Sequence, residues 1–290
     1  MSKPPKLVAI VGETASGKSA IALELARRHN GEIINADSWQ VYREMDIGTA
    51  KPSSVEQSEV PHHLIDIVAP DQDFTAAVYK ELAQTAISEV VERGKLPILV
   101  GGTGLYIDCV LFDYSFMPPG KAGERASLQA KSIPELLKQI EVAGYDLTAV
   151  DIRNKRRLIR LIETRGQTPK RTPLRKNTLV VGVHIPRAQL RKNIESRVEV
   201  MLRRGLKHEV RELAEKYGWE VEAMRGIGYR EWQAYFESNQ SNQETRRRII
   251  KATLDLAKRQ RTWFKRNRDI IWVSEVDEAD RFVEKFLDTV

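Results

Sequence analysis

Short apolar runs alternate with segments whose apolar residues recur at helical spacing through the first 113 residues. Such runs predict buried strands, and the spaced segments predict amphipathic helices. We expect strands that begin at Leu7 and that lie at 31–36, within 61–70 and at 96–100. We expect helices at 19–29 and 75–93, the second between an N-cap at Thr75 and a stop at Gly94. This alternation predicts a doubly wound parallel sheet.

The pattern changes after residue 113. Residues 114–123 have the composition of a linker. Helical signals then continue to about residue 165, with breaks at Pro134 and Gly144 and without a β-rich run. Residues 166–173 have the composition of a turn. The whole stretch predicts a helical subdomain.

A β-rich run at 179–184 predicts that the chain then returns to the sheet. We therefore expect an inserted helical domain at 114–176 within a core formed by 1–113 and 177–290. The remaining predicted elements are helices at 186–204, 205–217, 231–237, 242–267 and 277–289 and a strand at 270–273.

Composition narrows the class of protein. Of 290 residues, 41% are hydrophobic and 30% are charged, which is typical of a globular protein. No apolar run approaches the roughly 18 residues of a membrane span, and the first residues lack a signal-peptide pattern, so we expect a cytoplasmic protein that does not contact membranes. The single cysteine, Cys109, excludes an internal disulfide framework, and we expect it to be a buried apolar residue.

The net charge of +7 is unevenly distributed. Residues 1–113 hold 10 Lys or Arg and 16 Asp or Glu, whereas residues 114–290 hold 37 and 24. Between Arg153 and Lys176 there are ten Lys or Arg and one acidic residue, Glu163. This asymmetry favours a polyanion such as RNA docking on the second part, although a solvated basic surface explains the charge alone equally well.

A phosphate-binding motif joins the first predicted strand to the first helix. Gly12 is followed by four residues and then by Gly17, Lys18 and Ser19. Glycines let the backbone approach a phosphate, the helix N-terminus presents N–H groups, Lys18 adds a positive charge, and the Ser19 hydroxyl suits Mg²⁺. The predicted fold class is therefore α/β, with a P-loop-type doubly wound sheet, an inserted small helical domain and C-terminal helices.

Two further strand ends are expected at the same edge of the sheet. Asp37 and Ser38 follow the second predicted strand, and a Gly-Gly-Thr turn ending at Thr103 follows the strand at 96–100. A carboxylate beside bound phosphates can hold Mg²⁺ through water or take a proton from a nucleophile. Asp37 is therefore the first candidate, with a capping or turn aspartate as the alternative. We expect residues 39–52 to form a loop lining this site.

Other conspicuous side chains favour structural roles. His62 and His63 are adjacent and lack the spacing of zinc ligands, so we expect them to be structural or to support the residues of a nearby site. Trp263 and Phe264 lie on the long basic helix. Aromatic rings there can stack on unpaired bases, but we favour positions in the core.

Six segments carry a family resemblance. In chain order they are VGETASGKS, NADSWQVYREMDIGTAKP, PHHLIDIVAPDQDFTAA, LVGGTGLYI, RGIGYREW and LAKRQRTWFKR. Together they resemble the tRNA dimethylallyltransferases, also called tRNA isopentenyltransferases. The resemblance implies Mg²⁺-assisted transfer of a dimethylallyl group from dimethylallyl diphosphate to N6 of the adenine 3′ of the anticodon. The phosphate loop would then hold the donor diphosphate rather than ATP, and the tRNA anticodon stem-loop would be the partner of a monomeric enzyme.

The resemblance also implies residue roles. Asp37 would be the general base, Arg197 would neutralise the leaving pyrophosphate, and Lys18 and Thr103 would complete the catalytic group. The donor would bind to Gly12, Glu13, Thr14, Ala15, Ser16, Gly17, Lys18 and Ser19, with Ser19 also the metal ligand. The tRNA would contact Asp37, Ser38, Trp39, Gln40, Val41, Thr103, Arg125, Arg156, Arg157, Leu158, Ile159, Arg160, Arg225, Gly226, Ile227, Gly228, Tyr229 and Arg230. Glu13 stands where the family usually has proline, and we expect its side chain to point to solvent.

Three alternatives remain open. An adenylate isopentenyltransferase would act on free AMP or ATP and would not need a basic insertion. A small-molecule kinase would need an arginine-bearing lid, which the insertion could imitate. An RNA-binding NTPase would need a strand that ends in an aspartate, whereas the corresponding strand here ends in VGGTG.

Overall fold

The computed structural model describes residues 4–117, 120, 123–148, 150–167, 170–238 and 240–289. The chain divides into two compact units. The larger comprises Met1–Leu111 and Leu174–Val290, and the smaller comprises Phe112–Pro173. Parts of the predicted linker (118, 119, 121 and 122) and of the predicted turn (168 and 169) lie outside the described residues.

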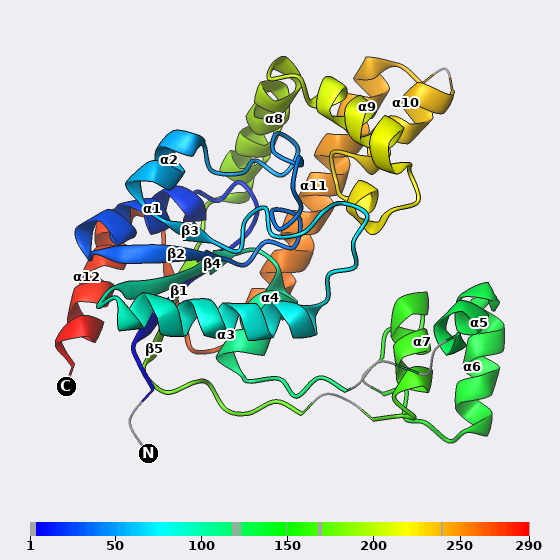
Figure 1. The fold of residues 1–290 in the computed structure, drawn as a ribbon, viewed down its shortest axis with the longest axis horizontal. Coiled ribbons are helices and arrows are strands. Elements are labelled where there is room, and N and C mark those ends of the chain that lie inside the picture. The colour runs from blue at the N-terminus through cyan, green and yellow to red at the C-terminus, as the bar shows by residue number, and fades with distance from the viewer. Residues whose placement is uncertain are drawn as a thin grey trace. The chain divides into compact units, whose positions relative to one another are not determined.

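Six parallel strands form one sheet in the order β3-β2-β4-β1-β5-β6 (Figure 1). They are β1 (Leu7–Gly12), β2 (Gly31–Asn35), β3 (His62–His63), β4 (Leu96–Gly101), β5 (Thr178–Val183) and β6 (Ile270–Val273). The central strand is β1, where Ile10 lies opposite Val100 of β4 and Val181 of β5. Later strands add on both sides of β1, which confirms the predicted doubly wound α/β fold. The chain also returns to the sheet, as β5, after the smaller unit.

Helices cover both faces of this sheet. The helices of the larger unit are α1 (Lys18–Arg28), α2 (Ser54–Glu59), α3 (Ala76–Glu92), α4 (Gly104–Leu111), α8 (Arg187–Arg203), α9 (Leu206–Tyr217), η1 (Glu222–Arg225), η2 (Arg230–Trp232), α10 (Gln233–Glu237), α11 (Asn242–Phe264) and α12 (Val276–Asp288). Helices α1 and α12 pack with Val8 and Ile10 in one apolar cluster. Intervening strand residues such as Ala9 and Leu99 point the other way and are also buried. Helices α3, α4 and α11 contact the sheet as well, and Figure 1 shows α3 and α1 on opposite faces.

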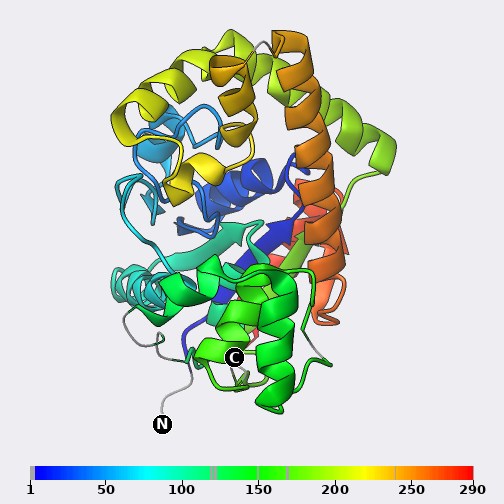
Figure 2. The ribbon, with the colours of Figure 1, turned by 90° about the vertical axis from the view of Figure 1, so that its right-hand side faces the viewer.

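The long helix α11 connects distant parts of the larger unit. It contacts α8, η2, α4 and β1, and Figure 2 shows it running past the sheet. Its buried residues include Ile249, Ile250, Gln260 and Phe264. Side chains near its C-terminal end therefore reach the strand end at which the phosphate loop begins.

Most predicted elements of the larger unit are confirmed to within a few residues. Thr75 caps α3 by accepting a hydrogen bond from the Val78 N–H at 3.3 Å, and Gly94 follows the helix with a φ of 70°. Three of these helices were not predicted: α2, α4 and the short 3-10 helix η1. Helix α2 buries none of its residues and so has no apolar periodicity, and α4 is apolar on nearly every side, which hides its period.

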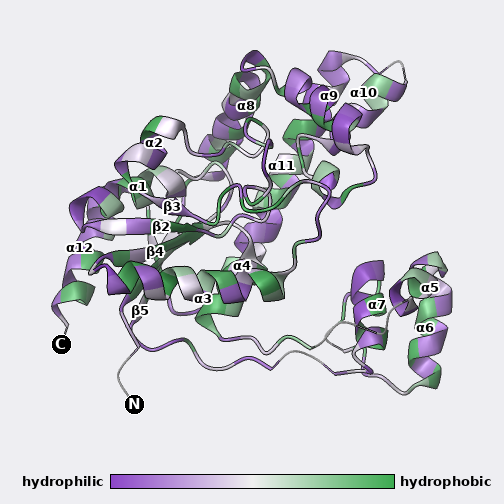
Figure 3. Cartoon of the chain, in the orientation of Figure 1, coloured by the Kyte–Doolittle hydropathy of each residue, from purple (hydrophilic) through white to green (hydrophobic). Residues whose placement is uncertain are grey.

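The smaller unit is a three-helix cluster with its own apolar core. Its helices are α5 (Glu124–Ala130), α6 (Ile133–Val142) and α7 (Lys155–Glu163). The core residues are Leu128, Leu136, Ile140, Leu158, Ile159, Leu161 and Ile162. Arg156 and Arg157 on α7 are exposed, so that helix has one apolar and one basic face. Figure 3 shows both kinds of residue on α7.

The structure bears on two predictions made from composition, those on membrane spans and on Cys109. Among the described residues, the helices are too short or too polar to span a membrane. Cys109 is fully buried, as predicted, and burial raises the pKa of its thiol to about 12. The thiol is therefore protonated near neutral pH and has little nucleophilic character.

Candidate active site

The carboxyl ends of β1, β2 and β4 meet at one cavity of about 260 Å³. Polar residues of the phosphate loop and of the strand ends line this cavity, and Arg197 of α8 also lines it. The polar lining includes Thr14, Lys18, Ser19, Asn35, Asp37, Gln40 and Arg197. A second group of lining residues is apolar and comprises Leu23, Ile33, Pro52, Ile65 and Val100. The cavity can therefore hold a small molecule that has an anionic end and an apolar end.

The phosphate loop has the backbone shape that its glycines predict. Ala15 and Gly17 have φ values of 61° and 93°, and α1 begins directly afterwards at Lys18. A left-handed residue before the helix turns the chain so that N–H groups of the first helical turn face the same side as the loop. Ser19, in this first turn, is exposed and lines the cavity.

The positively charged side chains of Lys18 and Arg197 line the cavity and are largely shielded from solvent. Burial lowers the pKa of Lys18 to about 8, while the Asp37 carboxylate opposes the shift and the charge of Arg197 adds to it. Burial also lowers the pKa of Arg197, and Asp37 again opposes the shift. The Arg197 guanidinium donates to the Thr49 carbonyl oxygen at 3.3 Å. Two desolvated cations beside the Asp37 carboxylate favour the binding of an anion.

A hydrogen-bonded turn after β2 fixes the position of Asp37. The Asp37 N–H donates to Asn35 Oδ1 at 3.1 Å, and Asp37 Oδ1 accepts the Trp39 N–H at 2.9 Å. Asn35 Nδ2 in turn donates to the carbonyl oxygens of Leu64 and Asp37 at 3.1 and 3.2 Å. The carboxylate is thus aimed at the cavity by its own turn. Both the turn and the site interpretations of Asp37 are therefore compatible with its geometry.

Thr103 supports the same turn from β4. Its hydroxyl accepts the Ser38 N–H at 3.0 Å and donates to Ser38 Oγ at 3.2 Å. Gly101 allows the close approach of the two strand ends, because a Cβ atom there would lie 2.1 Å from the Ala36 carbonyl oxygen. The Thr103 hydroxyl is therefore occupied in positioning the turn.

A second cavity, of about 60 Å³, adjoins the first and shares lining residues with it. Thr14, Asp37 and Arg197 line both cavities. The other lining residues of the second are mostly apolar and include Trp39, Ile194, Val198, Met201, Ile227, Ile249 and Leu256. Asp37 and Arg197 thus stand between a largely polar cavity and a largely apolar one.

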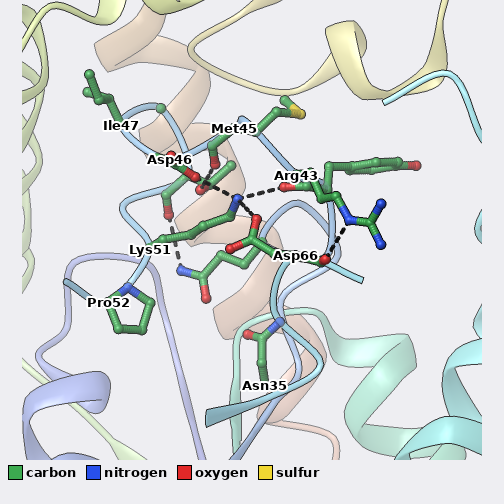
Figure 4. A network of polar contacts seen from close by, with 12 residues as sticks. Asn35, Arg43, Met45, Asp46, Ile47, Lys51, Pro52 and Asp66 are labelled. Carbon is green, nitrogen blue, oxygen red and sulfur yellow. Dashed lines mark hydrogen bonds and ion pairs between the residues drawn. The ribbon is translucent and has the colours of Figure 1, made fainter. Parts of the chain in front are cut away.

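The loop at 39–52 is irregular, as predicted, and buried side chains hold its shape. The ammonium group of Lys51, with only 4% of the side chain exposed, donates to the Tyr42 carbonyl oxygen and pairs with Asp46 and Asp66 (Figure 4). Gln40 Nε2 donates to the carbonyl oxygens of Thr49 and Ala50, both at 3.2 Å. This network fixes the loop that carries the Thr49 carbonyl to Arg197.

A carboxylate of α9 holds the other side of this loop. Glu209 Oε2 accepts the N–H groups of Asp46 and Ile47 at 3.0 and 2.7 Å. Its Oε1 accepts the Gly48 N–H at 3.0 Å and the Tyr229 hydroxyl at 2.7 Å. Gly48 has no room for a Cβ atom, which would lie 2.5 Å from the Tyr229 ring. Glu209 therefore joins the loop to the turn at 225–230.

Comparison with known proteins identifies the family. A family model described as IPP transferase matches residues 40–267. A tRNA dimethylallyltransferase of Desulforudis audaxviator is 40% identical over 302 residues, covering 96% of this chain and 94% of the relative. One from Roseiflexus is 41% identical over 281 residues, covering 91% and 92%.

The chain belongs to the IPP transferase family. A solved structure agrees: the tRNA isopentenylpyrophosphate transferase of Bacillus halodurans has a TM-score of 0.78 at 35% identity, with 98% of this chain and 97% of the other covered. The corresponding protein of Staphylococcus epidermidis has a TM-score of 0.73 at 32% identity, with coverages of 97% and 99%. The resemblance drawn from the six sequence motifs is thereby confirmed.

In this IPP transferase, the structure brings together only part of the proposed site. Residues of the phosphate loop, Asp37 and Arg197 line the cavity, and Thr103 hydrogen-bonds to Ser38 beside Asp37. The side chains of Leu158 and Ile159, proposed to contact tRNA, instead form part of the core of the smaller unit. Helical periodicity places these apolar residues on the inner face of α7.

Only some residues of the proposed tRNA-contact turn at 225–230 are exposed to solvent. Arg225 and Arg230 are exposed, but Gly226, Gly228 and Tyr229 are buried. The Tyr229 side chain packs against Gly48 and hydrogen-bonds to Glu209, so it supports the loop at 39–52.

In the smaller unit, two of the arginines proposed to contact tRNA are held by an ion pair. Arg125 and Arg160 both pair with the buried Glu163 carboxylate.

The expected orientation of Glu13 was wrong. Its side chain is 5% exposed and pairs with Arg261 of α11, with Oε1 lying 2.7 Å from Arg261 Nε. The neighbouring Gln260, which sequence reasoning missed, accepts the Thr14 N–H at 2.7 Å and donates to the Gly102 carbonyl oxygen at 2.9 Å. The LAKRQRTWFKR motif therefore contributes directly to the shape of the phosphate loop.

The aromatic and histidine predictions largely agree with the structure. Phe264 is buried, whereas Trp263 is half-buried and donates its indole N–H to Asp108 at 3.0 Å. His62 Nδ1 contacts the Val60 carbonyl oxygen at 2.7 Å, and His63 Nε2 lies 2.6 Å from Glu32. Both contacts hold the histidine rings in place, and His62 also lines the cavity at the phosphate loop.

Proposed function

We propose that this protein transfers a dimethylallyl group from dimethylallyl diphosphate to N6 of the adenine 3′ of a tRNA anticodon, with release of pyrophosphate. One observation carries the proposal: Asp37 and Arg197 line both a cavity at the phosphate loop and an adjoining, mostly apolar cavity. A donor diphosphate in the first and an acceptor base from the second would meet at a carboxylate. The printed names of the relatives, tRNA dimethylallyltransferases, support this acceptor.

The reaction requires help at both reactants. Adenine N6 is a weak nucleophile because its lone pair is delocalised into the ring. As N6 attacks the allylic carbon, the bond from that carbon to the diphosphate oxygen breaks and its electron pair leaves with the pyrophosphate. Lys18 and Arg197, both poorly hydrated, would stabilise that developing charge. Asp37 would accept the N6 proton as the new bond forms.

The residues present also fit a Mg²⁺ ion bound to the donor. Ser19 offers an exposed hydroxyl at the start of α1, beside the cavity. Among the described residues, no group of three or more His, Cys, Asp or Glu could hold a metal ion, so diphosphate oxygens would supply most of the ligands. Such an ion would add positive charge to the leaving group.

The tRNA would be held outside the chemical site. The target adenine must leave the stack of the anticodon loop to reach a recessed carboxylate. The exposed Arg156, Arg157, Arg225 and Arg230 are our candidates for phosphate contacts. Ser38, Trp39, Gln40 and Ile227 stay candidates for contacts near the base, and the monomeric state and cytoplasmic location stay predictions.

The experiment is direct. The full chain is incubated with dimethylallyl diphosphate, ATP, Mg²⁺ and unmodified tRNA, and the tRNA is then digested to nucleosides for mass spectrometry. We expect an adenosine carrying one added dimethylallyl group and an equal amount of released pyrophosphate. Unmodified adenosine together with consumption of added ATP would contradict the proposal and favour a kinase or an NTPase.

A further inference from the structure

A buried ion pair stands inside the phosphate loop. Glu13 directly follows Gly12, yet its carboxylate lies within the protein and faces the guanidinium group of Arg261. Arg261 Nη2 donates to Glu13 Oε2 at 2.8 Å, and Arg261 Nε lies 2.7 Å from Glu13 Oε1. The two side chains are only 5% and 14% exposed. One carboxylate oxygen therefore accepts a hydrogen bond from the guanidinium group, and the other lies in ion-pair contact with Nε without hydrogen-bond geometry.

This pair is close to the groups that would hold the donor. The Glu13 carbonyl oxygen accepts the Lys18 ammonium at 3.3 Å and the Ser16 N–H at 3.2 Å. The negative charge of Glu13 also acts on Lys18, since it raises the pKa of that lysine against the effect of burial. A charge that affects Lys18 will also affect a diphosphate bound beside Lys18.

We propose that Arg261 is a positioning and charge-balancing residue of the donor site, which cancels the Glu13 carboxylate and so permits a diphosphate to bind in this loop. This inference rests on the proposed function only for the identity of the donor. An uncancelled carboxylate beside the phosphates would repel them in a poorly hydrated site. Gln260 complements this role, because its amide joins the phosphate loop to the Gly102 carbonyl of the β4 end.

Charge balancing and simple structural support predict different results for single substitutions. Glu13→Gln removes the carboxylate and leaves the cation of Arg261, so it should strengthen diphosphate binding. Arg261→Gln leaves the carboxylate and should weaken it. The double variant restores neutrality and should bind like the parent. Simple structural support predicts instead that both single variants weaken binding.

The test measures binding of inorganic pyrophosphate and of dimethylallyl diphosphate to the full chain by calorimetry, with Mg²⁺ and without RNA. We expect Arg261→Gln to raise the Kd about tenfold and Glu13→Gln to lower it severalfold, as for one unit charge at several ångströms in a partly hydrated site. Lys265→Gln, which removes an exposed cation at the C-terminal cap of α11, is the matched control and should retain the parent Kd.

Folding is checked by circular dichroism. If Arg261→Gln does not fold, the comparison of Glu13→Gln with the double variant still tests the inference. Charge balancing requires Glu13→Gln to bind pyrophosphate more tightly than the double variant does. Equal Kd values for all variants, or weaker binding by both single variants, would overturn the inference. Failure of the proposed function would give a different result. The variants would bind pyrophosphate in the expected order of Kd values, but no dimethylallyl group would be transferred to tRNA.

Discussion

The strand-end site of the larger unit and helix α7 of the smaller unit both carry several cations, but their surroundings differ. Lys18 and Arg197 are partly buried, and burial lowers the pKa of each. Arg156 and Arg157 of α7 are exposed to solvent. Poorly hydrated cations interact strongly with one anion at short range, whereas solvated cations attract a polyanion over longer distances and are screened by salt.

The two regions also differ in how their side chains are held. The turn of Asp37 is fixed by bonds from Asn35, Ser38 and Thr103. On the smaller unit, Arg125 and Arg160 share the buried Glu163 carboxylate. The first arrangement suits chemistry that depends on exact distances, and the second suits a surface that presents positive charge. We expect substitutions in the two regions to change different kinetic quantities.

The largest expected effect is that of Asp37→Asn. The new side chain keeps an oxygen that can accept the Trp39 N–H, so the turn should persist, but it cannot take the N6 proton. We expect the single-turnover rate constant to fall by about 10²–10⁴ while the Kd for tRNA changes little and the Kd for the donor falls, because a carboxylate beside Lys18 is neutralised. Asp71→Asn, at an exposed position, is the control. Loss of tRNA binding by Asp37→Asn would make Asp37 a docking residue instead.

Glu209→Ala tests the support of the loop at 39–52. The substitution leaves three backbone N–H groups and the Tyr229 hydroxyl without their shared acceptor. We expect the free energy of unfolding to fall by about 2–3 kcal/mol, and Tyr229→Phe, which removes one of these bonds, to lower it by about 1 kcal/mol. Chemical denaturation measures both. An unchanged midpoint for Glu209→Ala would show that the loop does not depend on this carboxylate.

The pH dependence of donor binding tests the poorly hydrated lysine. Because the pKa of Lys18 in the free protein is about 8, its positive charge is present below that pH and is lost above it. Pyrophosphate affinity should therefore fall by about tenfold between roughly pH 7 and pH 9. Calorimetry at several pH values measures this, and Lys18→Met should bind weakly with a much flatter profile. An unchanged slope in that variant would assign the pH dependence to another group.

The smallest expected effect is that of the paired change Arg156→Gln and Arg157→Gln. Loss of two solvated cations should weaken tRNA binding severalfold and reduce the slope of log affinity against log salt by about one to two. The rate constant at saturating tRNA should change little. Lys138→Gln, an exposed site on α6, is the control. A parental salt slope in the double variant would place the docking surface elsewhere.

The parts of the site that were predictable depend on local patterns. The phosphate loop has a fixed spacing, and the position of Asp37 follows from the rule that parallel strands end at one edge of a sheet. Both α2 and α4 were missed because neither shows an apolar period: one buries none of its residues, and the other is apolar except for Asp108.

The missed residues share a different property. Lys51, Glu209, Gln260 and Arg261 all act through partners that are distant in the chain or lie in a loop without periodicity. Glu13 shows the consequence. Its charge alone favours a solvent-facing side chain, and only the position of α11 reveals the buried partner. Local sequence patterns carry no information about such contacts.

The most direct test of the central claim offers the enzyme two acceptors at once. Unmodified tRNA and AMP are incubated together with dimethylallyl diphosphate, and ribonuclease fragments of the tRNA and the free nucleotide are analysed by mass spectrometry. The predicted result is a dimethylallyl group on the fragment that holds the adenine 3′ of the anticodon, with AMP unmodified. A dimethylallyl group on AMP, with unmodified tRNA, would contradict the claim that the second cavity receives a base from RNA.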